Sequence, residues 1–117
     1  MSFIGTNENN VDHVPSLVTI NDAAPVKLCD VNDRRMTLRV SLPCTNDTIC
    51  VVVAPTSQDA ADLKGETLYQ NFIGADNPYK PEVVFDVNTS AQGEKWAILD
   101  IVSDPASLEL SVNEYIG

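Results

Sequence analysis

Residues 36–42 read Met-Thr-Leu-Arg-Val-Ser-Leu, an alternation of apolar and polar side chains with a period of two. Successive side chains of a β-strand point to opposite faces, so this segment predicts an antiparallel strand with one buried and one exposed face. Residues 108–113, Leu-Glu-Leu-Ser-Val-Asn, repeat the alternation near the end of the chain. Residues 49–53, Ile-Cys-Val-Val-Val, are apolar throughout and predict a central strand covered on both faces.

Outward from these segments, short apolar runs recur between groups of Asn, Asp, Ser, Gly and Pro. The expected strands are Ser16–Ile20, Pro25–Cys29, Arg35–Leu42, Thr48–Ala54, Glu66–Ile73, Glu82–Val87, Glu94–Val102 and Ser107–Tyr115. Ser57–Leu63 is the one helical candidate, with Ser57 as its cap. This spacing of strands and turns predicts an all-β fold, a single antiparallel β-sandwich of about eight strands with at most one short helix.

The length of 117 residues corresponds to one domain. Residues 1–14 are mostly polar and are expected to form a flexible N-terminal arm, which leaves residues 15–117 as the sandwich domain. Phe3 and Ile4 are the main apolar side chains of this arm before Val11. The chain has no apolar run long enough for a membrane helix, and its first residues lack the pattern of a secretion signal. These features predict synthesis in a cytoplasm.

Seven basic and seventeen acidic residues give a net charge of −10. Binding to nucleic acid needs a basic face, and anionic membranes repel an acidic protein, so we expect neither as a partner. Arg35 and Arg39 lie four residues apart on one expected strand and should project from the same face, opposite the apolar residues. They either balance neighbouring acids or form a contact patch for another subunit.

Residues with catalytic or metal-binding potential are few. His13 is the only histidine and lies in the polar arm, where a surface role is expected rather than a catalytic one. Asp30, Asn32 and Asp33 could offer oxygen ligands to calcium, but the glycine and glutamate of an EF-hand loop are missing, which favours a turn. We therefore predict a protein that is not an enzyme and holds no cofactor and no metal.

The cysteines and aromatic residues leave alternatives open. Cys29, Cys44 and Cys50 are expected as reduced thiols in the core, and the rival is a Cys44–Cys50 bridge across a turn. Trp96 is expected to be a packing residue. The predicted interface residues are Phe3, Ile4, Arg35, Arg39, Tyr69, Phe72 and Tyr79.

Two stretches of the chain resemble small bacteriophage virion proteins with a β-sandwich fold. Residues 28–40, Leu-Cys-Asp-Val-Asn-Asp-Arg-Arg-Met-Thr-Leu-Arg-Val, are similar to a turn that leads into an early strand of those proteins. Residues 93–98, Gly-Glu-Lys-Trp-Ala-Ile, with the alternating residues 106–115, resemble their closing pair of strands. The resemblance spans about residues 25–115 and departs from the pattern at Asp30-Val31 and over Ser57–Tyr79.

The resemblance implies a capsid decoration (cement) protein that binds the outside of an assembled shell and stabilises it. Its partners would be the major capsid protein or other virion subunits, and copies of the chain would form a homotrimer or another homo-oligomer on the particle. Its location would be the virion surface. A tail or head-fibre accessory protein is one alternative, and a carbohydrate-binding or adhesion module is another.

Overall fold

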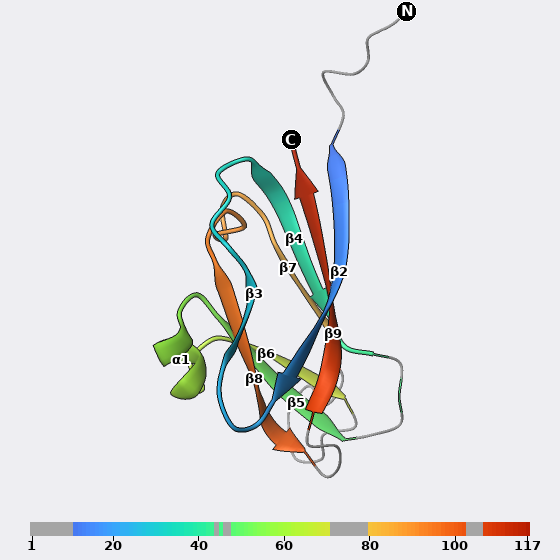
Figure 1. The fold of residues 1–117 in the computed structure, drawn as a ribbon, viewed down its shortest axis with the longest axis vertical. Helices are drawn as coiled ribbons and strands as arrows, with labels where there is room; N and C mark the ends of the chain where they lie inside the picture. The colour runs from blue at the N-terminus through green and yellow to red at the C-terminus, as the bar shows by residue number, and fades with distance from the viewer. Residues whose placement is uncertain (1–10, 44, 46–47, 71–79, 103–106) are drawn as a thin grey trace, which may run out of the picture.

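The chain forms two four-stranded antiparallel sheets (Figure 1). The computed structural model describes residues 11–43, 45, 48–70, 80–102 and 107–117. The first sheet has the order β2 (Asp12–Asn21), β9 (Ser107–Ile116), β4 (Arg35–Ser41) and β7 (Glu82–Phe85). The second has the order β3 (Val26–Cys29), β8 (Lys95–Val102), β5 (Ile49–Ala54) and β6 (Glu66–Gln70). The predicted all-β sandwich is confirmed, with eight strands in the described residues.

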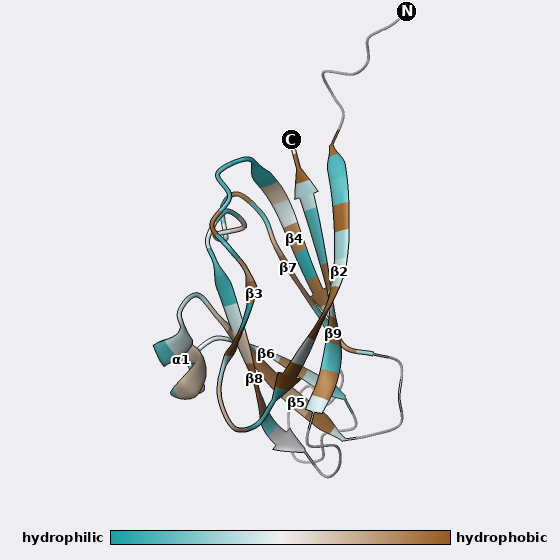
Figure 2. Cartoon of the chain, in the orientation of Figure 1, coloured by the Kyte–Doolittle hydropathy of each residue, from teal (hydrophilic) through white to brown (hydrophobic). Residues whose placement is uncertain are grey.

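The main core lies between the two sheets and follows the alternation of the sequence. On β4, Leu38 and Val40 are buried, and on β9 the same holds for Leu108, Leu110 and Val112. Figure 2 shows the resulting bands of hydrophobic and hydrophilic residues along β4 and β9. Each buried side chain of this size contributes about 1.5–3 kcal/mol relative to an exposed one, so the inward faces of these strands hold the sheets together.

Strand β5 is buried along its whole length, as its apolar run predicts. Ile49, Val51 and Val53 join the main core between the sheets. Val52 and Ala54 point to the other side, where a smaller cluster forms with Ile98 of β8 and Ala60 of the helix. Trp96 packs against this cluster, so its predicted packing role is confirmed.

The helix α1 (Ser57–Ala61) is shorter than predicted, and its N-cap lies one residue before the expected one. Thr56, not Ser57, is the N-cap: its backbone is extended, and its side-chain oxygen accepts a hydrogen bond from the backbone N–H of Asp59 at 3.0 Å. Asp62 is the C-cap, and Leu63 follows it with a φ of 59°. None of the helices among the described residues is long and apolar enough to cross a membrane.

The boundary of the N-terminal arm differs from the prediction. Residues 12–14 belong to β2, where Asp12 pairs with Ile116 and Val14 with Glu114 of β9. Both faces of this part of β2 are exposed. It therefore needs no apolar side chains on one face, and its sequence lacks the alternation that marks the other strands. Phe3 and Ile4 lie outside the described residues.

His13 is held on the sheet rather than in an arm, which corrects the expected position. Its imidazole ring stacks on the ring of Tyr115, with 4.7 Å between the ring centroids and 3° between the planes. Its Nε2 lies 2.7 Å from Oδ1 of Asn113. The side chain is nevertheless exposed, as predicted.

Candidate functional site

The two outer faces of the sandwich differ in what covers them. Helix α1 packs through Ala60 on the outer face of the sheet β3-β8-β5-β6. In the part of the chain that the structure describes, no element lies over the outer face of the sheet β2-β9-β4-β7 (Figure 1). We call this second surface the open face. It is a rigid surface of four paired strands that solvent reaches directly.

The open face carries both apolar and charged side chains. Leu17 of β2 is 66% exposed and lies beside Ser111 of β9, while Val84 of β7 lies beside Arg39 of β4. Further exposed or half-exposed side chains that the register places on this face include His13, Pro15, Thr19, Thr37, Ser41, Glu82, Glu109, Asn113 and Tyr115. Leu17 and Val84 lie on the two edge strands of this sheet, so the open face carries separate apolar side chains among polar and charged ones.

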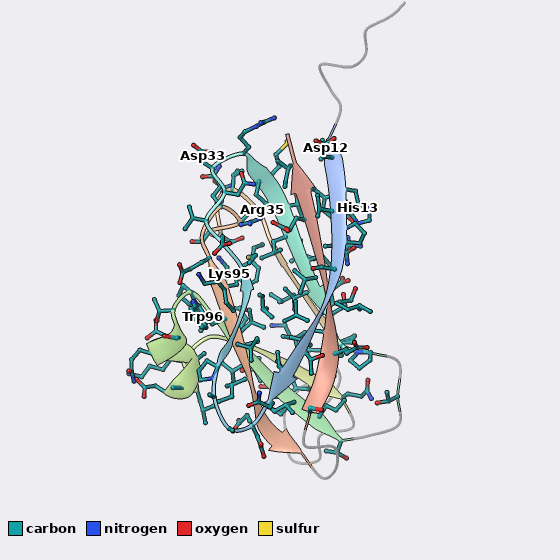
Figure 3. All side chains as sticks on the ribbon, viewed as in Figure 1. Asp12, His13, Asp33, Arg35, Lys95 and Trp96 are labelled. Carbon is teal, nitrogen blue, oxygen red and sulfur yellow. The ribbon has the colours of Figure 1, made fainter. Side chains whose placement is uncertain are left out.

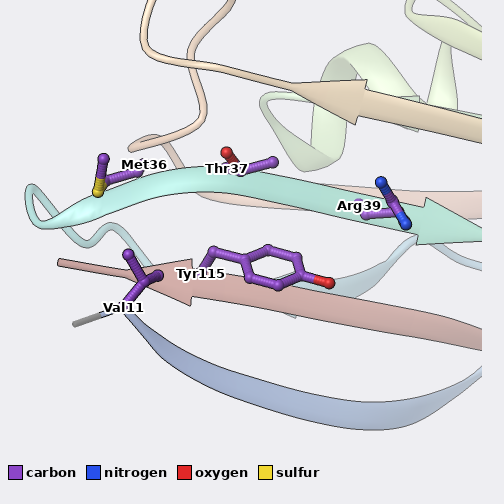
Figure 4. Close-up of a pocket in the computed structure, with 5 residues that line it drawn as sticks. All are labelled: Val11, Met36, Thr37, Arg39 and Tyr115. Carbon is purple, nitrogen blue, oxygen red and sulfur yellow. The ribbon is translucent and has the colours of Figure 1, made fainter. Parts of the chain in front are cut away.

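A groove of about 420 Å³ lies at the end of the open face near the start of β2. It is lined by Val11, Met36, Thr37, Arg39 and Tyr115. Figure 4 shows Val11 and Met36 at one end, Arg39 at the other, and the Tyr115 ring between them. The groove therefore combines an apolar end with a cationic end.

Gly117 and a bulge in β4 shape this groove. The register of β4 against β9 shifts between Arg35 and Thr37, and Met36 at this bulge is 48% exposed. Gly117 packs closely against Met36, because a Cβ on this glycine would come within 2.9 Å of the Met36 sulfur. The backbone N–H of Gly117 donates to the carbonyl of Arg34 at 2.9 Å, and the Arg34 Nε donates back to the Gly117 oxygen at 2.8 Å. These contacts fix the apolar end of the groove.

Arg39 projects from the open face, as predicted. Its Nε lies 3.4 Å from Oε2 of Glu82, and both side chains are partly exposed. Glu82 also accepts a hydrogen bond from the Ser41 hydroxyl at 3.1 Å. An exposed pair of this kind contributes only about 0–1 kcal/mol to stability, so Arg39 can exchange partners at small cost.

The prediction that Arg35 shares an outer face with Arg39 is wrong. Arg35 is 1% exposed and lies between the sheets (Figure 3). Its Nη2 and Nε donate to Oε1 of Glu114 at 2.7 and 2.9 Å, and its guanidinium also donates to the carbonyls of Asp30 and Ala91. The bulge after Arg35 adds a residue to the strand, which reverses the side to which Arg35 points.

Lys95 is a buried cation that sequence reasoning missed. It is 2% exposed, and its ammonium donates to the carbonyls of Ser90 at 2.5 Å and Gly93 at 3.3 Å. The same ammonium lies 4.8 Å from the centre of the Phe85 ring. Burial is the main cause that lowers the pKa of Lys95; Cys29 acts in the opposite direction and Arg35 in the same one. The alternation of side chains along β8 could have predicted this burial, because Lys95 lies two and four residues before the inward-facing Ala97 and Leu99.

A second cavity of about 180 Å³ lies beside Lys95. Its lining includes Gly65, Glu66, Thr89 and Ser90. The Lys95 ammonium is directed at protein carbonyls and a ring, so its role is to hold residues 86–93 against the core. We assign this cavity no ligand.

Among the remaining aromatic residues predicted for the interface, Tyr69 is the one that the structure describes, and it does not lie on the open face. Tyr69 lies on β6 in the other sheet and is partly buried, with its backbone paired to Lys80. Phe72 and Tyr79 lie outside the described residues. The interface role of these aromatic residues therefore remains a prediction.

The acidic turn at residues 30–33 is used for local contacts. The Asp30 carboxylate pairs with Lys27 at 2.9 Å, and the Asn32 side chain accepts from the backbone N–H of Arg34 at 2.9 Å. Across the described residues, no group of three or more His, Cys, Asp or Glu side chains is arranged to hold a metal ion.

Two of the cysteines are core residues, as expected. Cys29 and Cys50 are both buried, and burial is the main reason that the pKa of the Cys29 thiol is raised. Cys44 lies outside the described residues, so the alternative of a Cys44–Cys50 bridge stays open.

No family model, curated protein or solved structure matches this chain. The resemblance to phage virion proteins therefore depends on the residues quoted for it.

Proposed function

We propose that this chain is a non-enzymatic structural protein that binds the subunits of a larger assembly through the open face. The observation that carries the proposal is the contrast between the two outer faces. On one of them α1 packs over β5 and β8 through Ala60, whereas the other presents Leu17, Val84 and Arg39 to solvent. Covering exposed apolar area contributes about 25 cal/mol per Å², so a flat partner surface placed over these side chains would be held mainly by apolar burial.

In its most specific form, the proposal is a decoration protein on the outside of a phage capsid. The resemblance of residues 28–40, 93–98 and 106–115 supports this form, and so does the net charge of −10, which suits docking on a basic lattice. The partner is then the major capsid protein or another virion subunit. Residues 1–10, with Phe3 and Ile4 as apolar anchors, extend the contact to an adjacent subunit.

Binding to shells tests this proposal directly. Particles of the virus that encodes the chain are prepared without it, and the occupancy of added protein is measured by co-sedimentation. Leu17→Glu places a charge at the most exposed apolar position of the open face and should lower the affinity by at least about tenfold, because burying an unpaired carboxylate costs more than 1.4 kcal/mol. Deletion of residues 1–10 should also weaken binding, while leaving β2 complete.

Val87→Glu is the matched control, because Val87 is a similarly exposed aliphatic residue on the loop after β7. It should bind as the unchanged protein does. Equal occupancy for Leu17→Glu and the unchanged chain would overturn the assignment of the open face. A few copies per particle instead of many would favour a tail or head-fibre accessory protein.

A further inference from the structure

Leu63, which follows α1, is unusual both in its exposure and in its backbone conformation. It is 47% exposed although it is a large apolar residue, and its φ of 59° lies in the left-handed region. Glycine or asparagine normally occupies such a position after a helix, because a side chain there costs about 1–2 kcal/mol. The backbone itself is well bonded, since the N–H of Leu63 donates to the Ala60 carbonyl at 3.0 Å. An exposed leucine in this backbone conformation suggests a contact that the isolated domain does not make.

The side chain next to Leu63 adds a negative charge to this tip. Asp62 is exposed, and its carboxylate accepts hydrogen bonds from the side chain of Gln58 at 3.1 Å. We call Asp62 and Leu63 the leucine tip. It presents an apolar side chain and a carboxylate side by side.

The groove on the open face has the complementary character. Its apolar end is formed by Val11 and Met36, and its cationic end by Arg39 (Figure 4). We propose that the leucine tip of one copy binds the groove of a second copy, with Leu63 between Val11 and Met36 and Asp62 directed toward Arg39. The volume of about 420 Å³ has room for both side chains.

The tip and the groove lie on opposite outer faces of the sandwich. The tip follows α1, which covers the sheet β3-β8-β5-β6, whereas the groove lies on the sheet β2-β9-β4-β7. A contact between two different surfaces of the same molecule is heterologous, and each copy then offers a free tip and a free groove to further copies. The contact therefore joins copies head to tail.

The net charge of −10 determines when this contact forms. Two free copies repel each other at low ionic strength, where the screening length is about 30 Å in 0.01 M salt, but only weakly in 1 M salt, where it is about 3 Å. The groove is part of the open face, so a copy bound to an assembly through that face cannot receive a tip there. The contact is therefore one between free copies, and it does not rest on the proposed function.

Sedimentation velocity of the full chain tests the contact without any partner. In about 0.01 M salt the protein should be monomeric, and in about 1 M salt its weight-average sedimentation coefficient should rise with protein concentration. Leu63→Gly should abolish the rise. Because glycine accepts a φ of 59°, this variant should unfold at the same or a higher temperature than the unchanged chain, so misfolding would not explain the loss.

Met36→Ser should abolish association from the groove side, and Val87→Ser, which changes an exposed valine outside both surfaces, should leave it unchanged. A mixture of Leu63→Gly with Met36→Ser provides the sharpest test. The first variant keeps a groove and the second keeps a tip, so the mixture should form dimers and nothing larger, although each variant alone is monomeric.

The inference is overturned if the unchanged chain stays monomeric in 1 M salt, or if Leu63→Gly associates as strongly as the unchanged chain. These outcomes are separate from the test of the proposed function. If the chain stays monomeric in 1 M salt but binds shells, only the contact between copies is contradicted. If the chain self-associates but does not bind shells, only the proposed function is contradicted.

Discussion

Two buried cations, Arg35 and Lys95, lie close together inside the sandwich. The Gly93 carbonyl accepts from Nη1 of Arg35 and from Nζ of Lys95, both at 3.3 Å, and lies 4.0 Å from the Cys29 sulfur. Arg35 also has the Glu114 carboxylate, whereas Lys95 has backbone carbonyls and the Phe85 ring. A buried charge is tolerated only when its donors are satisfied, so the two cations and the loops that supply their acceptors fold as one unit.

Replacing Lys95 by Met should change how stability depends on pH. Burial lowers the pKa of Lys95 in the folded chain below its ordinary value of 10.5, so the unfolded chain binds more protons between these two values. The free energy of unfolding of the unchanged chain should therefore rise with pH across this window, relative to Lys95→Met. The raised pKa of Cys29 acts in the opposite sense above pH 9.0, and the Lys95 charge lowers that pKa, so the two proteins are compared below pH 9.0 to isolate Lys95. Urea titrations from neutral pH to pH 9.0 would measure the difference, and a constant difference would contradict the predicted role of Lys95.

The sequence predicted the side of a residue correctly wherever the strand is regular. Leu38, Val40 and Arg39 lie where the alternation of residues 36–42 places them. Arg35 and Met36 do not, because the bulge between Arg35 and Thr37 inserts a residue that the alternation does not reveal. Met36, an apolar residue predicted to be inside, thereby becomes part of the groove.

Among the secondary-structure elements, the strands could be predicted because each combines an apolar run with turn residues at its ends. The ends of β4, β5, β8 and β9 differ from the expected bounds by one residue or less. The start of β2 was missed because residues 12–14 pair with β9 without burying a face. The helix cap was missed because Thr56 and Ser57 are adjacent and both are good caps. Only the extended backbone of Thr56 distinguishes them.

Thr56→Ala should lower the free energy of unfolding by about 1 kcal/mol, because the Asp59 N–H loses its side-chain acceptor. Ser57→Ala is the matched variant, since Ser57 lies within the helix and alanine favours a helix more than serine does. It should leave stability unchanged or raise it slightly. Urea denaturation of both variants would measure the effect. The reverse order of the two effects would mean that Ser57 caps α1 in solution.

At the scale of the whole molecule, the order of the strands in the sheets creates the groove, which the sequence pattern does not predict. Strand β9 lies between β2 and β4, so it joins the beginning and the end of the described chain in one sheet. The groove forms there from Val11, from residues 36–39 and from Tyr115, three segments that are far apart in sequence. Which sheet is left open depends on the side to which α1 folds. The strands were therefore predictable, whereas the candidate site required the arrangement of the strands.

The net charge of −10 leads to a prediction about binding to the proposed assembly. If the acidic chain docks on a basic lattice, its affinity for shells should fall as salt is raised from about 0.05 to 0.5 M, because the Debye length shrinks from more than 10 Å to less than 8 Å. Glu109 lies on the open face beside Thr19, so Glu109→Gln should reduce the dependence of log Kd on log salt concentration. Asp33→Asn, on the exposed turn before β4, is the control and should keep the original slope. Co-sedimentation at several salt concentrations measures all three slopes. Affinity that does not change with salt would mean that the apolar side chains Leu17 and Val84 dominate the contact and that the charge of the open face does not select its partner.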